Sequence, residues 1–121
     1  MAFKVDGVHR ISVRVFSGAR AELYRVVVPD KVLVNRWYTC IVTLKNAGDW
    51  QAKLGIQVVN ESGPGAVEAR VAGKTYRLDV GKMVEVSTKE AVPPGETRAL
   101  FFTLRFLAVG TYRLAIRYGH Y

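Results

Sequence analysis

The stretch VTLKNAGDWQAKLGIQVV, residues 42–59, contains two alternating apolar runs with a short polar turn between them. Apolar residues recur at every second position in both runs, which is the side-chain period of a β-strand with one buried face. Between the runs, Asn46 tolerates left-handed backbone and Gly48 favours it, so we expect them to end the first strand. The chain is then predicted to cross over and re-enter a sheet at Leu54.

The same two-residue period continues along most of the chain, whereas the apolar spacing of a helix is nearly absent. Turns rich in proline and glycine separate the runs, and Gly73 is expected to supply the positive φ of a tight hairpin. The predicted strands cover residues 10–16, 22–28, 37–45, 53–60, 67–72, 75–80, 82–88, 97–107 and 111–118, with an edge segment at 31–34. This pattern predicts an all-β, immunoglobulin-like antiparallel β-sandwich of about seven or eight strands, with residues 1–121 forming a single domain.

Alternation also predicts which side chains fill the core between the two sheets. At 121 residues the chain is long enough to bury such a core without a disulfide or a metal. The predicted core residues are Val13, Cys40, Val42, Leu44, Leu54, Ile56, Val58, Leu78, Leu100, Phe102, Leu104, Tyr112, Leu114 and Ile116.

Composition favours a soluble, cytoplasmic protein. The start of the chain, MAFKVDGVHR, has no apolar stretch long enough for a signal peptide, and no later run is long enough to span a bilayer. We therefore expect no membrane partner. Cys40 is the sole cysteine, so no intrachain disulfide can form, which fits a reducing compartment. Asparagine, glutamine and cysteine are scarce, which favours a thermophilic source.

Two segments resemble a known family of modules. In VTLKNAGDWQAKLGIQVV an alternating strand ends in Asn-x-Gly before the next strand, and VPPGETRALFFTLRFLAVGTYRLAIRY has a Pro-Gly turn, a long strand and then Gly-x-Tyr. This order is similar to that of CARDB-like immunoglobulin-fold modules over residues 37–118, and Gly110-Thr111-Tyr112 resembles the tyrosine corner of such sandwiches. The resemblance implies adhesion or binding, with no fixed catalytic set.

The chain also departs from that family. CARDB-like modules commonly occur as extracellular repeats, whereas this sequence has one such module and no secretion signal. The sequence ends soon after Tyr118, so we expect the last strand of the sandwich to come either from the N-terminal run or from a partner. The sequence leaves both alternatives open.

Residue types that carry catalysis are few and scattered. The two histidines lie near opposite ends of the sequence, and Cys40 points inward by alternation. His9, Cys40 and Asp79 would need a fold that brings them together, so an unrecognised hydrolase or transferase site stays an alternative. In the loop at residues 63–65, proline replaces an N–H group that a phosphate-binding loop needs. We predict a non-enzyme with no catalytic residues, no cofactor and no metal.

Charge is the strongest functional clue in the sequence. The formal net charge is +8, and no acidic residue follows Glu96. First and last strands are neighbours in many sandwiches, so we expect one basic sheet face. Its residues are Arg10, Arg14, Arg105, Arg113 and Arg117. Such a face could contact an acidic protein partner, bind nucleic acid with an aromatic side chain nearby, or be only a solvated surface.

Two aromatic residues are candidates for an interface. Trp50 follows the polar turn and is expected to be partly exposed, and Phe101 lies on the outward face of the longest predicted strand. The leading hypothesis is a non-catalytic binding or assembly module that docks a protein partner or forms a homo-oligomer through a sheet face or edge. The alternative is a nucleic-acid-binding protein that uses the arginine-rich sheet face.

Overall fold

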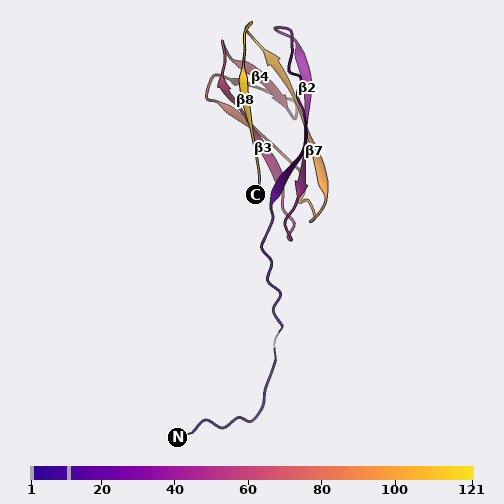
Figure 1. Cartoon of the computed structure of the whole chain (residues 1–121), viewed down its shortest axis with the longest axis vertical. Helices are drawn as coiled ribbons and strands as arrows, with labels where there is room; N and C mark the ends of the chain where they lie inside the picture. Colours follow the sequence, from indigo (N-terminus) through magenta and orange to yellow (C-terminus); the bar gives the residue numbers. More distant parts are fainter. Residues whose placement is uncertain (1, 11) are drawn as a thin grey trace.

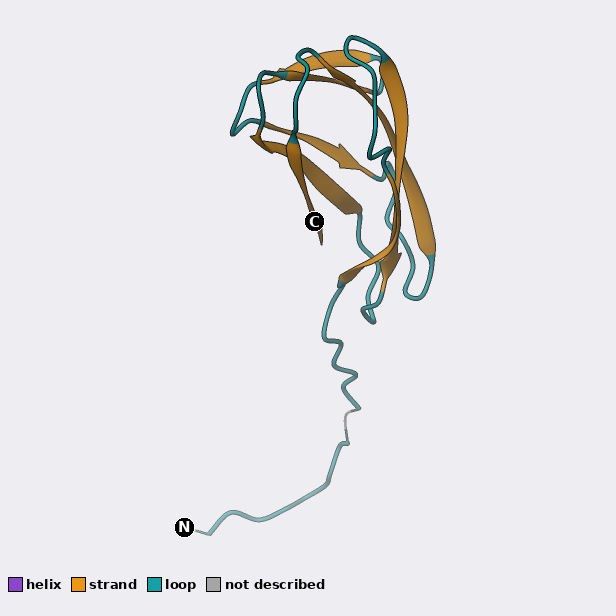
Figure 2. Cartoon of the chain, turned by 45° about the horizontal axis from the view of Figure 1, so that its top comes forward, coloured by secondary structure: helices purple, strands orange, loops and turns teal. Residues whose placement is uncertain are grey.

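A computed structural model describes residues 2–10 and 12–121, and every regular element in this part of the chain is a β-strand. The strands form two antiparallel sheets that pack face to face (Figures 1 and 2). The strand orders are β1-β2-β7-β4-β5 and β6-β3-β8. Their bounds are β1 Ala21–Val27, β2 Trp37–Asn46, β3 Leu54–Ser62, β4 Val67–Val71, β5 Lys74–Leu78, β6 Met83–Ser87, β7 Thr97–Phe106 and β8 Arg113–His120. This arrangement confirms the predicted all-β antiparallel sandwich. None of the described residues belongs to a helix long and apolar enough to cross a membrane.

The core lies between the two sheets, at the alternating positions predicted from the sequence. Val42 of β2 pairs with Leu100 of β7, for example, and both side chains are buried against the facing sheet. The predicted core residues confirmed as buried are Cys40, Val42, Leu44, Leu54, Ile56, Val58, Leu78, Leu100, Phe102 and Leu104. Three more predicted core residues are half-buried against this cluster, namely Tyr112, Leu114 and Ile116.

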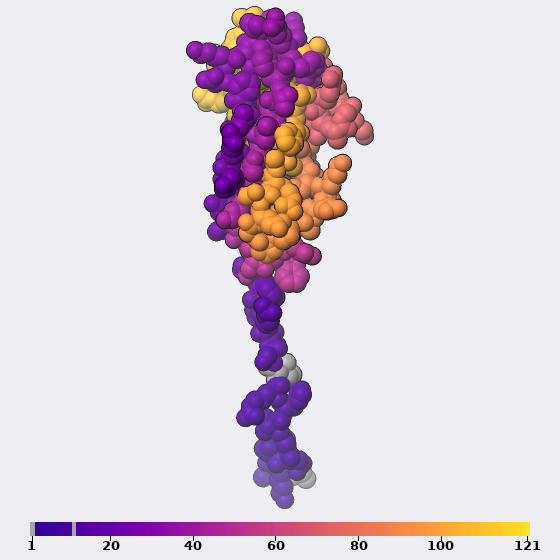
Figure 3. Space-filling view, turned by 90° about the vertical axis from the view of Figure 1, so that its right-hand side faces the viewer, coloured from indigo at the N-terminus to yellow at the C-terminus, as the bar shows by residue number. Residues whose placement is uncertain are grey.

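The strand predicted at residues 10–16 does not form. Residues 10 and 12–16 have no ladder partner, and the N-terminal segment runs away from the sandwich (Figures 1 and 3). Val13, predicted to lie in the core, is 76% exposed. Ile11, whose alternation supported the strand, lies outside the described residues. A strand needs a neighbour for its backbone hydrogen bonds, and alternation alone does not provide one.

Of the edge segment predicted at residues 31–34 and the hairpin predicted at Gly73, only the hairpin forms. Residues 31–34 form no edge strand and instead lead into Asn35, whose φ is 62° and whose N–H donates to the carbonyl of Phe106 at 2.8 Å. The hairpin predicted at Gly73 is confirmed, because Ala72 and Gly73 join β4 to β5 with φ values of 50° and 81°.

The turn at residues 46–50, called the Asn46 turn below, is built by a side chain rather than by left-handed backbone. Asn46 is fully buried, and its Nδ2 donates to two backbone carbonyls at 2.8 and 2.9 Å. Its Oδ1 accepts the N–H of Gly48 at 3.0 Å. Neither residue has a positive φ, so the predicted backbone role was wrong. A Cβ on residue 48 would lie 2.3 Å from the carbonyl oxygen of Gly18, which explains the glycine.

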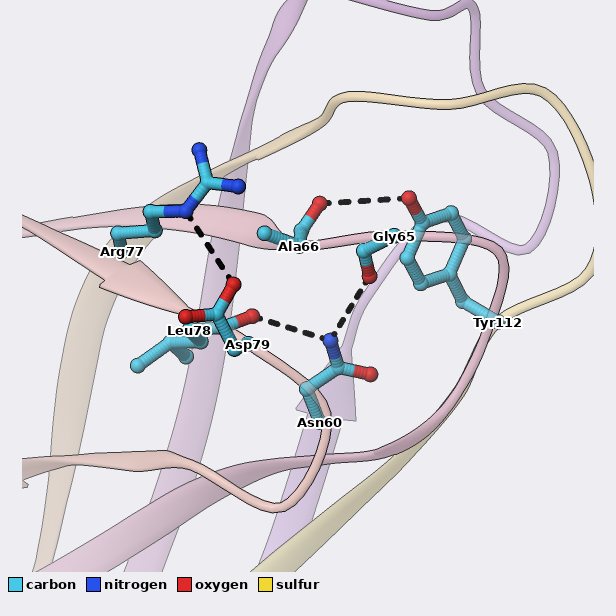
Figure 4. Close-up of polar contacts among 7 residues, drawn as sticks. All are labelled: Asn60, Gly65, Ala66, Arg77, Leu78, Asp79 and Tyr112. Carbon is cyan, nitrogen blue, oxygen red and sulfur yellow. Dashed lines mark hydrogen bonds and ion pairs between the residues drawn. The ribbon is translucent and has the colours of Figure 1, made fainter.

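At the other end of the sandwich, Asn60 joins two loops (Figure 4). Its side chain is fully buried, and its Nδ2 donates to the carbonyls of Gly65 at 3.2 Å and Leu78 at 3.1 Å. Beside it, the Tyr112 hydroxyl donates to the carbonyl of Ala66 at 3.3 Å. The resemblance to a tyrosine corner implied a bond to a nearby backbone group, but this partner lies 46 positions away in the sequence.

Candidate functional site

The outer face of the five-stranded sheet carries a row of apolar side chains at its centre, called the apolar row below. Val27 pairs with Ile41 across β1 and β2, and Ile41 pairs with Phe101 across β2 and β7. Phe101 is 60% exposed and Val27 is 39% exposed, with Ile41 half-buried between them. The predicted outward position of Phe101 is therefore confirmed, and no second layer of described residues covers it.

A groove lies beside Phe101, where β7 extends past the short strand β4. Among the residues that the structure describes, β4 pairs with β7 only between Thr103 and Phe106. The groove has a volume of about 830 Å³ and lies between β6 and β7. Its charged lining residues are Glu85, Lys89, Glu90 and Arg98. The ring of Phe101 therefore borders both the apolar row and a hollow of mixed charge.

The same sheet face holds a group of ordered charges, called the Trp37 cluster below. Trp37, Arg105 and Glu68 occupy one cross-strand row of β2, β7 and β4. The guanidinium carbons of Arg70 and Arg105 lie over the Trp37 ring, 4.3 and 5.0 Å from its centroid. Arg105 also forms an ion pair with Glu68 at 2.5 Å. Cation–π contacts and the ion pair restrict both arginine heads, so this part of the face presents fixed rather than freely moving charges.

The predicted basic face does not form as one surface. Arg10 and Arg14 lie in the N-terminal segment, outside both sheets. Arg105 belongs to the Trp37 cluster, whereas Arg113 and Arg117 lie on β8 of the three-stranded sheet. The expectation required residues 10–16 to pair beside the last strand. In the described part of the chain, β8 pairs with β3 instead.

Trp50, the second predicted interface aromatic, holds the N-terminal segment. Trp50 is 52% exposed, as expected, and its ring packs on Phe16 with 4.9 Å between the ring centroids. The carboxylate of Asp49 accepts the N–H groups of Ser17 and Gly18 at 2.9 and 2.8 Å. The bond from Ser17 is the chief cause that lowers the pKa of Asp49, and Gly18 adds to it. These five residues are called the tail clamp below.

The residues considered for catalysis lie apart. His9 is in the N-terminal segment, Cys40 is buried in β2, and Asp79 forms an exposed ion pair with Arg77 at 3.2 Å (Figure 4). Burial raises the pKa of the Cys40 thiol to about 11, which keeps the thiol protonated near neutral pH. Within residues 2–10 and 12–121, no group of three or more His, Cys, Asp or Glu side chains could hold a metal ion.

The candidate site is assigned from its geometry alone. No family model matches the chain, and no curated protein matches it significantly in sequence. Alternation predicted the exposure of Phe101, but Val27, Ile41 and Trp37 were not predicted as part of the site. Alternation could have placed Ile41 outward. Its position beside Phe101 depends on the register between β2 and β7, which no local pattern encodes.

Proposed function

We propose that this chain is a non-catalytic binding module that docks an acidic protein partner on the outer face of its five-stranded sheet. The apolar row is the observation that carries this function, because Phe101 is 60% exposed on the central strand of the sheet. An aromatic side chain on an uncovered sheet face gains free energy when a partner surface buries it. The resemblance to CARDB-like modules, which implies binding, supports the same class of function.

Charge around the apolar row favours an acidic partner over a second copy of the same face. Arg25 on β1 and Lys45 on β2 lie on the same face beyond the row, Lys45 opposite Glu22. The Trp37 cluster adds Arg70 and Arg105 with Glu68, so cations outnumber carboxylates among these residues. The formal net charge of the chain is +8. Two such faces in contact would bring like charges together, whereas carboxylates around an apolar centre on a partner would pair with them.

The experiment compares Phe101→Asp with Val109→Asp. Val109 is a matched control, because it is an apolar residue that is 84% exposed but lies in the loop between β7 and β8. Proteins retained by the immobilised chain from an extract of its source are identified, and the affinity of the purified partner is then measured by calorimetry. We expect Phe101→Asp to weaken binding by about 2 kcal/mol or more, as for a residue at the centre of an interface.

Two results would contradict the docking function. One is a wild-type chain that retains no partner. The other is a partner that binds Phe101→Asp as tightly as Val109→Asp, since the apolar row would then have no part in the contact.

No specific observation favours the nucleic-acid alternative, because its predicted arginines are divided between the N-terminal segment and the two sheets. A titration against labelled single- and double-stranded nucleic acid at several salt concentrations tests it. Binding whose log affinity falls linearly with log salt, and which Arg14→Ala and Arg117→Ala weaken, would replace protein docking as the function.

A further inference from the structure

One side of the sandwich, between β1 and β8, is open. β1 is an edge strand of the five-stranded sheet, and β8 is an edge strand of the three-stranded sheet. Within the part of the chain that the structure describes, each has a single neighbour in its sheet, and the two strands contact each other across the sandwich. A sheet of five strands therefore faces a sheet of three, so the smaller sheet cannot cover every strand of the larger one.

Side chains that face the core become exposed toward this open side. Leu44 on β2 is 0% exposed, whereas its partner on β1, Leu23, is 39% exposed. On the facing sheet, Ile56 of β3 is 1% exposed and its partner on β8, Tyr118, is 49% exposed. A cavity of about 590 Å³ adjoins the same side, and its apolar lining residues include Val28, Val32, Phe106, Tyr112 and Leu114. The open side thus exposes part of the core.

The N-terminal segment has the side-chain pattern of a strand but lies in neither sheet. Phe3, Val5, Val13 and Val15 lie in one phase of alternation, which Gly7 and His9 interrupt. Ile11, outside the described residues, shares that phase in the sequence. The four described side chains are 92%, 67%, 76% and 88% exposed, in the order given. A row of large exposed apolar side chains is typical of a surface that another protein surface covers.

The tail clamp directs this segment away from the open side of its own sandwich. Asp49 holds the N–H groups of Ser17 and Gly18, and Phe16 packs on Trp50. On the N-terminal side of the clamp, the segment extends away from both sheets (Figures 1 and 3). While the clamp is closed, the segment is therefore placed to meet another molecule.

We propose that the N-terminal segment of one copy adds as a strand to the free edge of β8 in a second copy. Addition at β8 widens the three-stranded sheet on the side where β8 contacts β1. The apolar face of the segment, with Val13 and Val15, then covers Leu23 and Val26, which are 39% and 42% exposed in the single chain. Addition at β1 would only widen the larger sheet. Strand addition supplies backbone hydrogen bonds for affinity and side-chain contacts for register.

This contact uses a sheet edge and is independent of the proposed docking function, which uses a sheet face. The donor segment and the acceptor edge are different surfaces, so the contact is heterologous. It either repeats into an open chain of copies or closes when two copies exchange segments. Both products are oligomers of this chain.

The test follows the mass of the full chain in solution as its concentration rises, by sedimentation or light scattering. Val13→Asp is compared with Ser12→Asp, which introduces the same charge at the adjacent exposed position, on the opposite face by alternation. Both positions lie outside the sandwich, so neither variant disturbs its folding. We expect wild type and Ser12→Asp to associate equally, and Val13→Asp to need at least about tenfold higher concentration, because its carboxylate would be buried.

Hydrogen exchange gives a second measurement that locates the contact. The backbone amides of β8 should exchange more slowly when the wild-type chain associates, and should stay unchanged in Val13→Asp. A chain that is monomeric at every concentration would overturn the proposal, as would association that Val13→Asp leaves unaltered. Association lost with Phe101→Asp but kept with Val13→Asp would assign the contact to the sheet face. A monomer that Val13→Asp destabilises would show that the segment pairs within its own chain.

Discussion

Asn46 and Asn60 close opposite ends of the sandwich with the same set of backbone bonds. The backbone N–H of each asparagine donates at 3.0 Å to the carbonyl of the residue that follows a glycine. The backbone carbonyl of the asparagine accepts the N–H of that glycine at 2.7 Å. The glycines are Gly95 for Asn46 and Gly81 for Asn60, with φ values of 82° and 90°. Buried backbone groups at a strand end must be paired, and the same kind of turn pairs them at both ends.

The side chains of the two asparagines differ in the use of one atom. Nδ2 of each donates to two loop carbonyls. Oδ1 of Asn46 accepts the N–H of Gly48 at 3.0 Å and that of Arg20 at 3.5 Å. Among the described residues, Oδ1 of Asn60 is buried without a partner. The same backbone bonds thus close both ends of the sandwich. At the Asn46 end, Oδ1 of the side chain also holds the backbone at Arg20, just before β1.

Alanine at each asparagine is the largest test of this difference. Asn46→Ala would remove the side-chain bonds to the carbonyls of Trp50 and Val92 and from the N–H of Gly48, and the Val92 carbonyl would keep only the N–H of Ala52. Asn60→Ala would remove two side-chain bonds to carbonyls. Unpaired buried groups are costly, so we expect the free energy of unfolding to fall by about 3–5 kcal/mol for Asn46→Ala and by about 2–3 kcal/mol for Asn60→Ala. Urea denaturation measures both values, and equal losses would contradict the expected difference.

Gly48→Ala and Gly63→Ala are a second matched pair, one at each end. A Cβ at residue 48 would lie 2.3 Å from the carbonyl oxygen of Gly18, and one at residue 63 would lie 2.4 Å from Cδ1 of Tyr112. We expect each variant to lose about 1–3 kcal/mol of stability through overpacking. Gly48→Ala pushes on backbone, so it alone should speed hydrogen exchange of the Asp49 N–H, which donates to Gly18. Faster exchange in Gly63→Ala as well would mean that the two ends are coupled.

Tyr112→Phe removes one hydrogen bond from the Asn60 end and keeps its packing. The hydroxyl donates to the Ala66 carbonyl, while the ring packs on Phe106 with 5.0 Å between centroids. We expect a loss of about 0.5–1.5 kcal/mol in urea denaturation. Tyr24→Phe, at a position that is 68% exposed, is the control. If both variants are equally stable, the Tyr112 hydroxyl contributes nothing to this end.

The smallest expected effect is a response to acid confined to the Asn46 end. The Ser17 N–H, chief among the causes, lowers the pKa of Asp49 below its ordinary value of 3.8 in the folded chain. Because the folded pKa is the lower one, the stabilising bonds are fully present above pH 3.8 and are lost as the pH falls through the folded value. NMR signals of the Ser17 and Gly18 N–H groups should move in this range, while that of Gly81 stays fixed. In Asp49→Asn the movement should disappear.

Alternation predicted most strands and most of the core because the side-chain period is a local property of the sequence. Residues 10–16 alternate as regularly as β2 but form no strand, since pairing depends on a distant neighbour. Asn60 was missed for a related reason. At the first turn Asn-x-Gly is visible in the sequence, whereas the glycine that pairs with Asn60 is Gly81, far along the chain.

The candidate site shows the same division between local and distant information. Alternation placed Phe101 outward, because that choice depends only on neighbouring residues in the strand. The apolar row and the Trp37 cluster each draw on three strands, so their membership follows from register and strand order. The basic face failed as a prediction because it assumed a strand order.

Cys40 gives the molecule an internal reporter of its own opening. It is the sole cysteine, is 0% exposed, and has a thiol pKa of about 11. A thiol reagent at neutral pH therefore reaches it only when the sandwich opens, and the rate of labelling follows the frequency of opening. A cysteine introduced on the surface could accordingly be labelled on the intact chain without first replacing the native one.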